Sequence, residues 1–204
     1  MIAVFDFDGT LVTNDSFVAF IRFACGRWSL INGLLLSFPF IVGMKLNLLS
    51  HEYTKEKVFG IFFRGWKVED FKQYCIEFIS EITKHLRKPV LEMLSKHSKN
   101  GDTIYIVSAS IENWIIPWAD QYNVSVIGTK IEINAEGLLT GHFASKNCNR
   151  EEKVRRLLEL EPNRDNYILY AYGDSIGDKE LVTFADFGVY IKEKEYRDGN
   201  NFKH

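Results

Sequence analysis

The chain has 204 residues, of which 46% are hydrophobic and 25% are charged. Such values are typical of a globular protein and exclude wholesale disorder, because a chain of this kind buries enough apolar surface to offset its loss of conformational entropy. Lys and Arg number 25 and Asp and Glu number 27, so the net charge is −2. This balance argues against a nucleic-acid partner bound through overall positive charge. At about 150 residues per domain, the length predicts one core domain with a modest insertion.

Cysteine usage and the first residues of the chain favour a cytoplasmic protein. Cys25, Cys75 and Cys148 lie far apart and form neither a CxxC pair nor a zinc-binding spacing. The chain reaches acidic residues almost at once and lacks the basic region that opens a secretion signal. We therefore expect reduced thiols and a cytoplasmic location.

The N-terminal part of the chain predicts one strand followed by several helices. The apolar run at 2–5 is continuous, which suits a strand buried on both faces of a parallel sheet. From about residue 15 to about residue 80, apolar residues recur at helical spacing and no clear strand pattern interrupts them. We therefore expect a core domain made of residues 1–14 and 81–204, with a helical domain inserted at 15–80.

One apolar segment of this insertion allows several interpretations. Residues 28–44 carry no charge, and Arg27 and Lys45 flank them. Their 17 residues lie at the short limit for a membrane span, which needs about 20, and Pro39 interrupts them. The segment predicts a pair of buried helices broken near Pro39, a helix that lies in a membrane interface, or a span.

Strands and helices alternate in the rest of the chain, apart from a hairpin pattern at 130–143 around Glu136 and Gly137. This alternation is typical of a doubly wound parallel sheet, and we expect a Rossmann-like α/β fold. Further strands are expected at 103–110, 124–129, 167–174 and 187–191, with a helix and glycine turn at 89–102 and helices at 112–122, 151–160 and 178–185.

Acidic and hydroxyl side chains follow the predicted strands, at the edge where open α/β sheets bind their ligands. Several carboxylates that converge there would repel one another strongly without a cation. Oxygen ligands without His or Cys suit Mg²⁺, so we expect a magnesium site. The side chains in question are Asp6 and Asp8 after the first strand, Ser108 and Ser110 at the end of the second, Asp174 and Asp178 after a late strand, and Lys153 at the start of a helix.

These residues resemble the four motifs of the haloacid dehalogenase-like (HAD) phosphatase superfamily. DFDGTL at 6–11 resembles its first motif, Ser108 its second, Lys153 its third and GDSIGD at 173–178 its fourth. All four come in order and in the expected strand or helix context, over nearly the whole chain. The helical insertion is similar to the C1 cap of the phosphoserine-phosphatase-like branch, subfamily IB, and we refer to it as the cap.

The resemblance implies a Mg²⁺-dependent phosphomonoester hydrolase. Asp6 would attack phosphorus and form an aspartyl-phosphate, while Asp8 would act as general acid and then as general base. Ser108 and Lys153 would complete the catalytic set by holding phosphoryl oxygens. The implied phosphate-binding residues are Gly9, Ser108, Ala109 and Lys153, and the implied metal ligands are Asp6, Asp8 through its main-chain carbonyl, Asp174 and Asp178.

The substrate stays open at this point. Ser108-Ala109-Ser110 stands where phosphoserine phosphatases have a Gly-rich stretch, which weakens a phosphoserine assignment. The apolar cap segment is similar to the cap of phosphatidylglycerophosphatase C-like members of the branch. This favours a lipid headgroup phosphate, with peripheral contact of the cap at the inner membrane surface. A small phosphorylated metabolite, a phosphoserine-like substrate and a non-catalytic binding module with the same fold are the alternatives. For the cap cations Lys55, Lys57 and Arg64, a solvated position is the default expectation.

Overall fold

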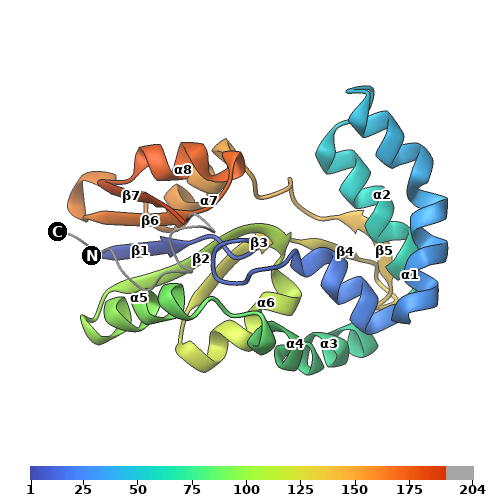
Figure 1. Ribbon diagram of the computed structural model, residues 1–204, viewed down its shortest axis with the longest axis horizontal. Coiled ribbons are helices and arrows are strands. Elements are labelled where there is room, and N and C mark those ends of the chain that lie inside the picture. The colour runs from blue at the N-terminus through green and yellow to red at the C-terminus, as the bar shows by residue number, and fades with distance from the viewer. Residues whose placement is uncertain (192–204) are drawn as a thin grey trace.

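The computed structural model describes residues 1–191, which form an α/β core beside a helical cap (Figure 1). The core is a five-stranded sheet in which every neighbouring pair is parallel and the order is β3-β2-β1-β6-β7. The doubly wound parallel sheet that the sequence predicts is therefore confirmed. The strands are β1 (Ile2–Phe5), β2 (Thr103–Ile111), β3 (Ser125–Thr129), β6 (Leu169–Gly173) and β7 (Phe187–Tyr190).

The side chains of the central strand β1 alternate between the two faces of the sheet, as those of any strand do. Ala3 and Phe5 belong to the apolar cluster under α5 and α6, whereas Ile2 and Val4 belong to the cluster under α7 and α8. All four side chains are buried, which explains why the run at 2–5 is continuously apolar. These helices are α5 (Lys88–Lys99), α6 (Glu112–Ala119), α7 (Glu151–Leu160) and α8 (Lys179–Phe184).

The cap packs on the core through aromatic side chains. Phe20 is fully buried and stacks on Trp114 of α6, with ring centroids 4.7 Å apart. The same ring contacts Phe63, Phe71 and Phe78 of the cap. Truncating such an aromatic side chain typically costs about 3–5 kcal/mol, so this cluster holds the two parts together. The cap helices are α1 (Ser16–Lys45), α2 (His51–Phe63), α3 (Val68–Glu77) and α4 (Ile79–Lys84).

The two predicted domain boundaries, near residues 15 and 80, fall at helices α1 and α4. Asp15 is the N-cap of α1, and its carboxylate accepts a hydrogen bond from the Val18 amide. Residue 80 lies inside α4. The division into domains at these positions stays a prediction, and residues 192–204 of the predicted core domain lie outside the described part of the chain.

Helix α1 differs from the interpretation of its apolar segment as buried helices broken near Pro39. The helix bends at Gly26, where φ is +79°, and continues through Pro39. Pro39 removes the hydrogen bond to the Leu35 carbonyl, but both residues are exposed, and water can replace the lost partner. Within 28–44 only Gly33 and Ser37 are buried. By length and composition α1 could cross a membrane, and among the described helices it alone could do so.

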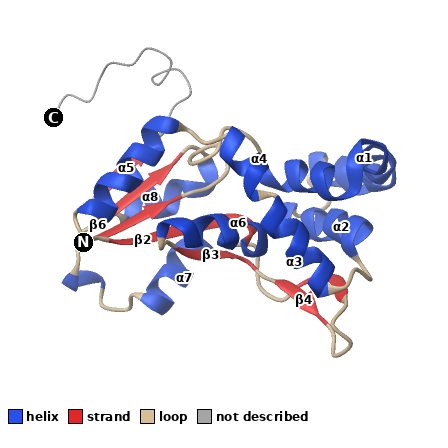
Figure 2. Ribbon diagram, turned by 90° about the horizontal axis from the view of Figure 1, so that it is seen from below, coloured by secondary structure: helices blue, strands red, loops and turns tan. Residues whose placement is uncertain are grey.

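The predicted hairpin is present as β4 (Ile131–Ile133) and β5 (Leu139–Phe143), and it packs on the cap rather than on the core sheet (Figure 2). The Glu56 carboxylate of α2 accepts a hydrogen bond from the Phe143 amide at 2.9 Å and contacts His142 at 3.0 Å. Arg64 donates from Nε to the Thr140 carbonyl at 3.0 Å. The hairpin therefore covers one side of α2.

Candidate active site

The carboxyl ends of β1, β2 and β6 meet at the edge of the sheet that faces the cap. Lys153, in the first turn of α7, extends its Nζ to Asp6 Oδ1 at 2.6 Å and to Asp178 Oδ1 at 2.5 Å. Oxygens of Asp6, Asp174 and Asp178 all lie within 4.8 Å of one another. The structure thus brings together four of the predicted site residues, Asp6, Lys153, Asp174 and Asp178, although they lie far apart in the sequence.

The pKa values of Asp6 and Lys153 are both raised, for different reasons. Burial raises the pKa of Asp6 to about 7, against the opposing effect of the neighbouring Lys153 charge. Burial by itself would lower the pKa of Lys153, but the charges of Asp6 and Asp178 raise it above its ordinary value. Lys153 therefore stays charged at neutral pH. Further positive charge beside Asp6 would favour its anionic form.

A different set of partners holds Asp8. Its carboxylate accepts hydrogen bonds from the Ser16 amide at 2.8 Å and from the Ser110 hydroxyl. The Ser16 hydroxyl contacts the Ser110 hydroxyl at 3.0 Å and accepts a hydrogen bond from Trp114 Nε1 at 3.1 Å. Burial raises the pKa of Asp8, although the hydrogen bonds from Ser110 and Ser16 oppose this. Burial thus shifts Asp8 toward its protonated form, which is the form that a general acid uses.

Ser110 and Ser16 both fix the direction of Asp8, a role that the sequence pattern does not predict for either. The pattern places Ser110 at the end of a strand and gives no indication for Ser16. A usable signal is the start of α1 directly after Asp15, because the first amides of a helix lack partners within the helix and attract carboxylates.

Ser108 is buried inside β2, beyond the pairing of Ile106 with Phe5. Its hydroxyl accepts a hydrogen bond from the Ser110 amide at 3.1 Å. Ala109 lies between them, and its carbonyl accepts hydrogen bonds from Lys55 Nζ at 2.9 Å and from the Thr129 hydroxyl at 2.6 Å. Within the described residues, the hydrogen bond of Ser108 is thus local rather than to Asp6 or Lys153.

Gly9 makes room for Asp174. The backbone of Gly9 has φ +76°, and a Cβ atom there would lie 2.3 Å from Asp174 Oδ2. The Thr10 hydroxyl donates to Asp174 Oδ1 at 3.1 Å, and Arg87 donates to the Gly9 carbonyl at 2.9 Å. This turn needs glycine both for its backbone conformation and for the close carboxylate.

The two carboxylate oxygens of Asp178 have different partners. One faces Lys153, and the other accepts hydrogen bonds from the Ser175 amide at 3.0 Å, the Ser175 hydroxyl at 2.9 Å and the Asp174 amide at 3.2 Å. Asp178 therefore shapes the loop that presents Asp174, besides adding negative charge to the cluster.

The carboxylate cluster fits a hard divalent cation. Its donors are all oxygens, as Mg²⁺ prefers. Burial raises the pKa of both Asp6 and Asp174, with the charge of Asp178 adding to the effect, so each carboxylate would be more stable as an anion beside a cation. The residues that would hold Mg²⁺ are Asp6 and Asp174, with Asp178 behind them and the Asp8 main chain at the same edge.

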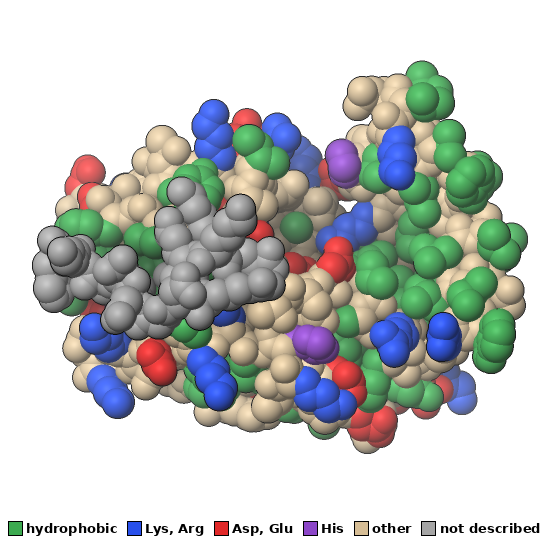
Figure 3. All heavy atoms as spheres, viewed as in Figure 1, with side chains coloured by type: hydrophobic (Ala, Val, Ile, Leu, Met, Phe, Trp, Pro, Cys, Tyr) green, Lys and Arg blue, Asp and Glu red, His purple; other side chains and the backbone are tan. Residues whose placement is uncertain are grey.

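A cleft of about 670 Å³ separates this edge from the cap. Figure 3 shows acidic and basic side chains at the hollow between core and cap, with hydrophobic side chains spread over the cap beside it. The cleft combines a polar core side with a largely apolar cap side. Its core side consists of Asp8, Ser110, Asn147, Asn149, Arg150, Ser175, Ile176 and Gly177, and its cap side of Asp15, Phe17, Val18, Leu34, Ile41, Met44, His51, Thr54, Lys55 and Val58.

Lys55 contradicts the expectation of a solvated cap cation. It extends from α2 into the cleft, where Nζ reaches the Ala109 carbonyl and lies 5.3 Å from the centre of the Phe17 ring. Burial lowers its pKa, while the charges of Asp8 and Asp15 oppose this. The spacing from Lys55 to the buried Val58 could have revealed this, because residues three apart share a helix face.

Lys57 and Arg64 do not line the cleft. Lys57 lies over the Tyr53 ring, 5.0 Å from its centre, and Arg64 bonds to the hairpin. Of the three cap cations, Lys55 is therefore the one within reach of a ligand.

Comparison with known proteins identifies the family. The sequence model of the haloacid dehalogenase-like hydrolases matches residues 3–182. Protein CicA of Caulobacter vibrioides is 30% identical over 202 residues, which cover 97% of this chain and 86% of CicA. A protein of unknown function from Bordetella pertussis Tohama I has a similar structure, with a TM-score of 0.75, 22% identity and coverage of 90% and 86%. A phosphoserine phosphatase solved as a phospho-aspartyl intermediate analogue gives a TM-score of 0.56 at 16% identity, with coverage of 90% and 82%. The chain therefore belongs to the haloacid dehalogenase-like hydrolase family.

Proposed function

We propose that the protein is a Mg²⁺-dependent phosphomonoester hydrolase that works through an aspartyl-phosphate on Asp6. The carrying observation is the contrast between two carboxyl groups. Burial raises the pKa of both groups, but Asp6 lies against the Lys153 ammonium, whereas Asp8 accepts hydrogen bonds from the neutral Ser16 and Ser110. One group is thereby suited to be a nucleophile and the other an acid. The phospho-aspartyl analogue of the related phosphoserine phosphatase supports the same assignment.

In the first step an Asp6 oxygen attacks phosphorus and the bond from phosphorus to the leaving oxygen breaks. Asp8 gives its proton to that oxygen, so the alcohol leaves neutral. In the second step Asp8 takes a proton from water, whose oxygen attacks phosphorus and releases Asp6 and inorganic phosphate. Lys153 holds Asp6 in place and offsets its charge throughout.

Magnesium, when bound by Asp6, Asp174 and the Asp8 carbonyl, would supply positive charge against the phosphoryl oxygens. Asp178 supports this set by holding the loop that carries Asp174. Gly9 and Ala109, with Ser108, would present main-chain and hydroxyl groups to the phosphate. The cap belongs, in this proposal, to the C1 type of subfamily IB.

A lipid headgroup phosphate of the phosphatidylglycerophosphate kind is our leading substrate class. The cap side of the cleft is largely apolar, with Leu34, Ile41 and Met44 from α1, and the half-buried Lys55 adds an ammonium group to it. Such a wall suits acyl or glycerol carbons close to a phosphate better than it suits a fully polar metabolite. The enzyme would then work at the cytoplasmic surface of the inner membrane.

A phosphoserine-like substrate is the second candidate, because Asp15 lines the same cleft as Lys55. One carboxylate and one ammonium could hold the amine and the carboxylate of an amino acid. The pair of Asp15 and Lys55 therefore favours a small zwitterionic phosphate ester, whereas the apolar wall of the cleft favours a lipid.

The test is Mg²⁺-dependent phosphate release from phosphoserine, glycerol 3-phosphate and detergent-dispersed phosphatidylglycerophosphate. We expect preference for the lipid and a loss of at least about 10³-fold in kcat for Asp6→Asn, because removing a nucleophile costs on the order of that or more. Asp120→Asn, an exposed carboxylate outside the cleft, is the matched control and should stay active. Full activity of Asp6→Asn would refute the nucleophile. Preference for phosphoserine would favour the second candidate, and no release under any condition would favour a binding module.

A further inference from the structure

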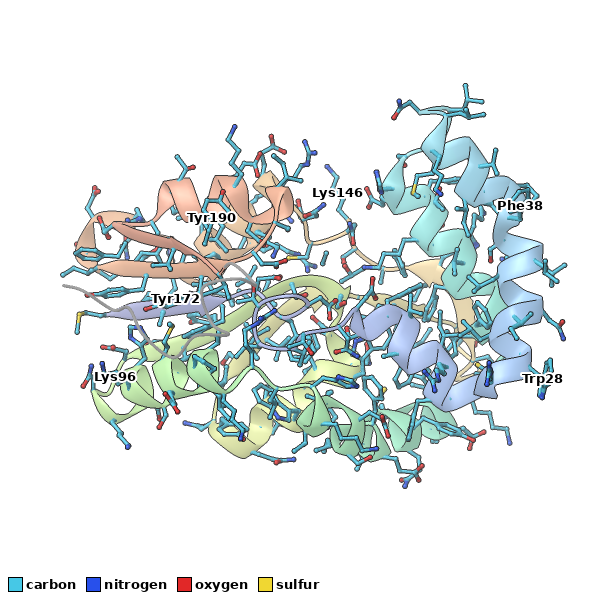
Figure 4. The ribbon with its side chains drawn as sticks, in the orientation of Figure 1. Trp28, Phe38, Lys96, Lys146, Tyr172 and Tyr190 are labelled. Atoms are coloured by element: carbon cyan, nitrogen blue, oxygen red, sulfur yellow. The ribbon has the colours of Figure 1, made fainter. Side chains whose placement is uncertain are left out.

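A stripe of large apolar side chains faces solvent along α1. Trp28, Ile31, Leu35 and Phe38 follow one another at intervals of three, four and three residues, which places them on one side of the helix. Their exposed fractions are 79%, 41%, 68% and 62%. Figure 4 shows Trp28 and Phe38 pointing away from the core. We call these four residues the outer face.

The opposite side of α1 already has its packing partner. A Cβ atom on Gly33 would lie 2.1 Å from the Phe62 ring of α2, so these helices touch closely. Ser37, one turn further on, is buried and bonds to the Gly33 carbonyl at 2.7 Å. The outer face is therefore not a core surface that has been left open. A helix that is apolar on both sides needs a second apolar neighbour.

The charges of α1 indicate what that neighbour is. The helix contains no acidic residue, and its three charged side chains, Arg22, Arg27 and Lys45, are all cationic and exposed. Arg27 and Lys45 flank the outer face, and the loop after the helix exposes Leu46. We propose that the outer face of α1 docks the protein onto the surface of a bilayer that contains anionic lipid. Apolar side chains would enter the interface while the cations meet lipid phosphates.

A second copy of the chain fits this face less well. An antiparallel pairing of two outer faces would place Arg27 of one copy near Lys45 of the other, and a parallel pairing would place equal cations together. No acidic side chain of α1 is present to compensate. A membrane span fits less well too, because it would separate Gly33 and Ser37 from α2.

The outer face and the cleft both use side chains of α1. Leu34 lines the cleft and is 40% exposed, and it precedes Leu35 of the outer face. Hydrophobic side chains extend over the cap from the cleft outward (Figure 3). Docking does not depend on the proposed hydrolase reaction, so Asp6→Asn should bind bilayers as the unchanged protein does.

Sedimentation with vesicles tests the docking. The full chain is mixed with phosphatidylcholine vesicles that contain or lack about one third phosphatidylglycerol, a fraction chosen to give the strong anionic surface that cationic docking needs. We expect binding to the anionic vesicles and at least a tenfold loss of the partition coefficient in Leu35→Gln/Phe38→Gln. The matched control is Leu160→Gln/Phe187→Gln. It replaces two apolar side chains of the α/β core domain that are similarly exposed to solvent, 56% and 52%, and it should bind normally.

Tryptophan fluorescence gives a second readout at α1 itself. Trp28 is exposed, whereas Trp114 and Trp118 are buried. Vesicles should shift the emission to shorter wavelength in the unchanged protein and not in Trp28→Phe. Three results would overturn the proposal. They are no binding to anionic vesicles, equal binding by the outer-face and control variants, and a dimer in solution that the outer-face variant abolishes.

Discussion

Gly9 has two roles that can be separated by experiment, one in the conformation of its backbone and one beside the carboxylate of Asp174. Replacing Gly9 by Ala disturbs both. The new methyl group would lie 2.3 Å from Asp174 Oδ2 and 2.6 Å from Asp174 Cγ, so the carboxylate must move. Moving it breaks the bond from Thr10 and displaces one of three candidate metal ligands. Overpacking of this kind costs about 1–3 kcal/mol. The left-handed backbone adds about 1–2 kcal/mol for any residue with a Cβ atom.

Gly101→Ala is the matched control. Gly101 has the same φ of +76°, and a Cβ atom there would meet nothing within 4 Å. It therefore shares the backbone strain and lacks the collision, and any effect of Ala on the unfolded chain is common to both variants. The difference between the two variants isolates the displacement of Asp174.

Two measurements check this reasoning. Urea denaturation in EDTA should show Gly9→Ala less stable than Gly101→Ala by about 1–3 kcal/mol. The Mg²⁺ concentration for half-maximal phosphate release should rise at least tenfold in Gly9→Ala, about 1.4 kcal/mol, and stay unchanged in Gly101→Ala. Equal stabilities and equal Mg²⁺ requirements of the two variants would refute the role of Gly9 beside Asp174.

Two other predictions concern Lys153 and Lys55. Lys153→Met should abolish turnover and lower the free energy of unfolding by about 3–5 kcal/mol at pH 8 in EDTA, because Asp6 and Asp178 lose their shared partner. The pKa of Asp6 is about 7 with Lys153 present, and removing the Lys153 charge raises it further, so this loss should shrink as the pH falls toward about 7 and stay constant below that. A loss of stability that does not change between about pH 9 and about pH 7 would contradict this. Lys55→Gln should raise KM about tenfold with a smaller change in kcat, as loss of a ligand contact of about 1.4 kcal/mol predicts, whereas Lys57→Gln should leave both constants unchanged.

The sheet and the position of the carboxylates could be predicted from sequence for one reason. Continuous apolar runs such as 2–5 define buried parallel strands, and parallel strands bring their carboxyl ends to one edge. Asp6 and Asp174 directly follow such runs, so their meeting needs no knowledge of side-chain packing. Lys153 joins them because α7 begins at the same edge.

The course of α1 and the direction of Lys55 could not be predicted in this way. Apolar composition at 28–44 is the same whether the helix faces a core or an open surface, and only the packing of Gly33 on Phe62 decides which side is inward. Lys55 points into the cleft because contacts with α1 and with the hairpin fix the orientation of α2 about its axis. Both depend on contacts between segments far apart in the chain, which local patterns do not encode.

The hairpin on α2 has a consequence for the order in which the chain can fold during synthesis. Backbone hydrogen bonds join Gly65 to Leu139 and Val68 to Gly137, so the turn after α2 is completed by residues made much later. At about 5–20 residues per second, the ribosome reaches Phe143 roughly 4–16 s after Phe63. During that interval the side of α2 that the hairpin covers lacks its final neighbour. A nascent chain of this protein is thus exposed to premature association at the stage when its cap is already made and its hairpin is not.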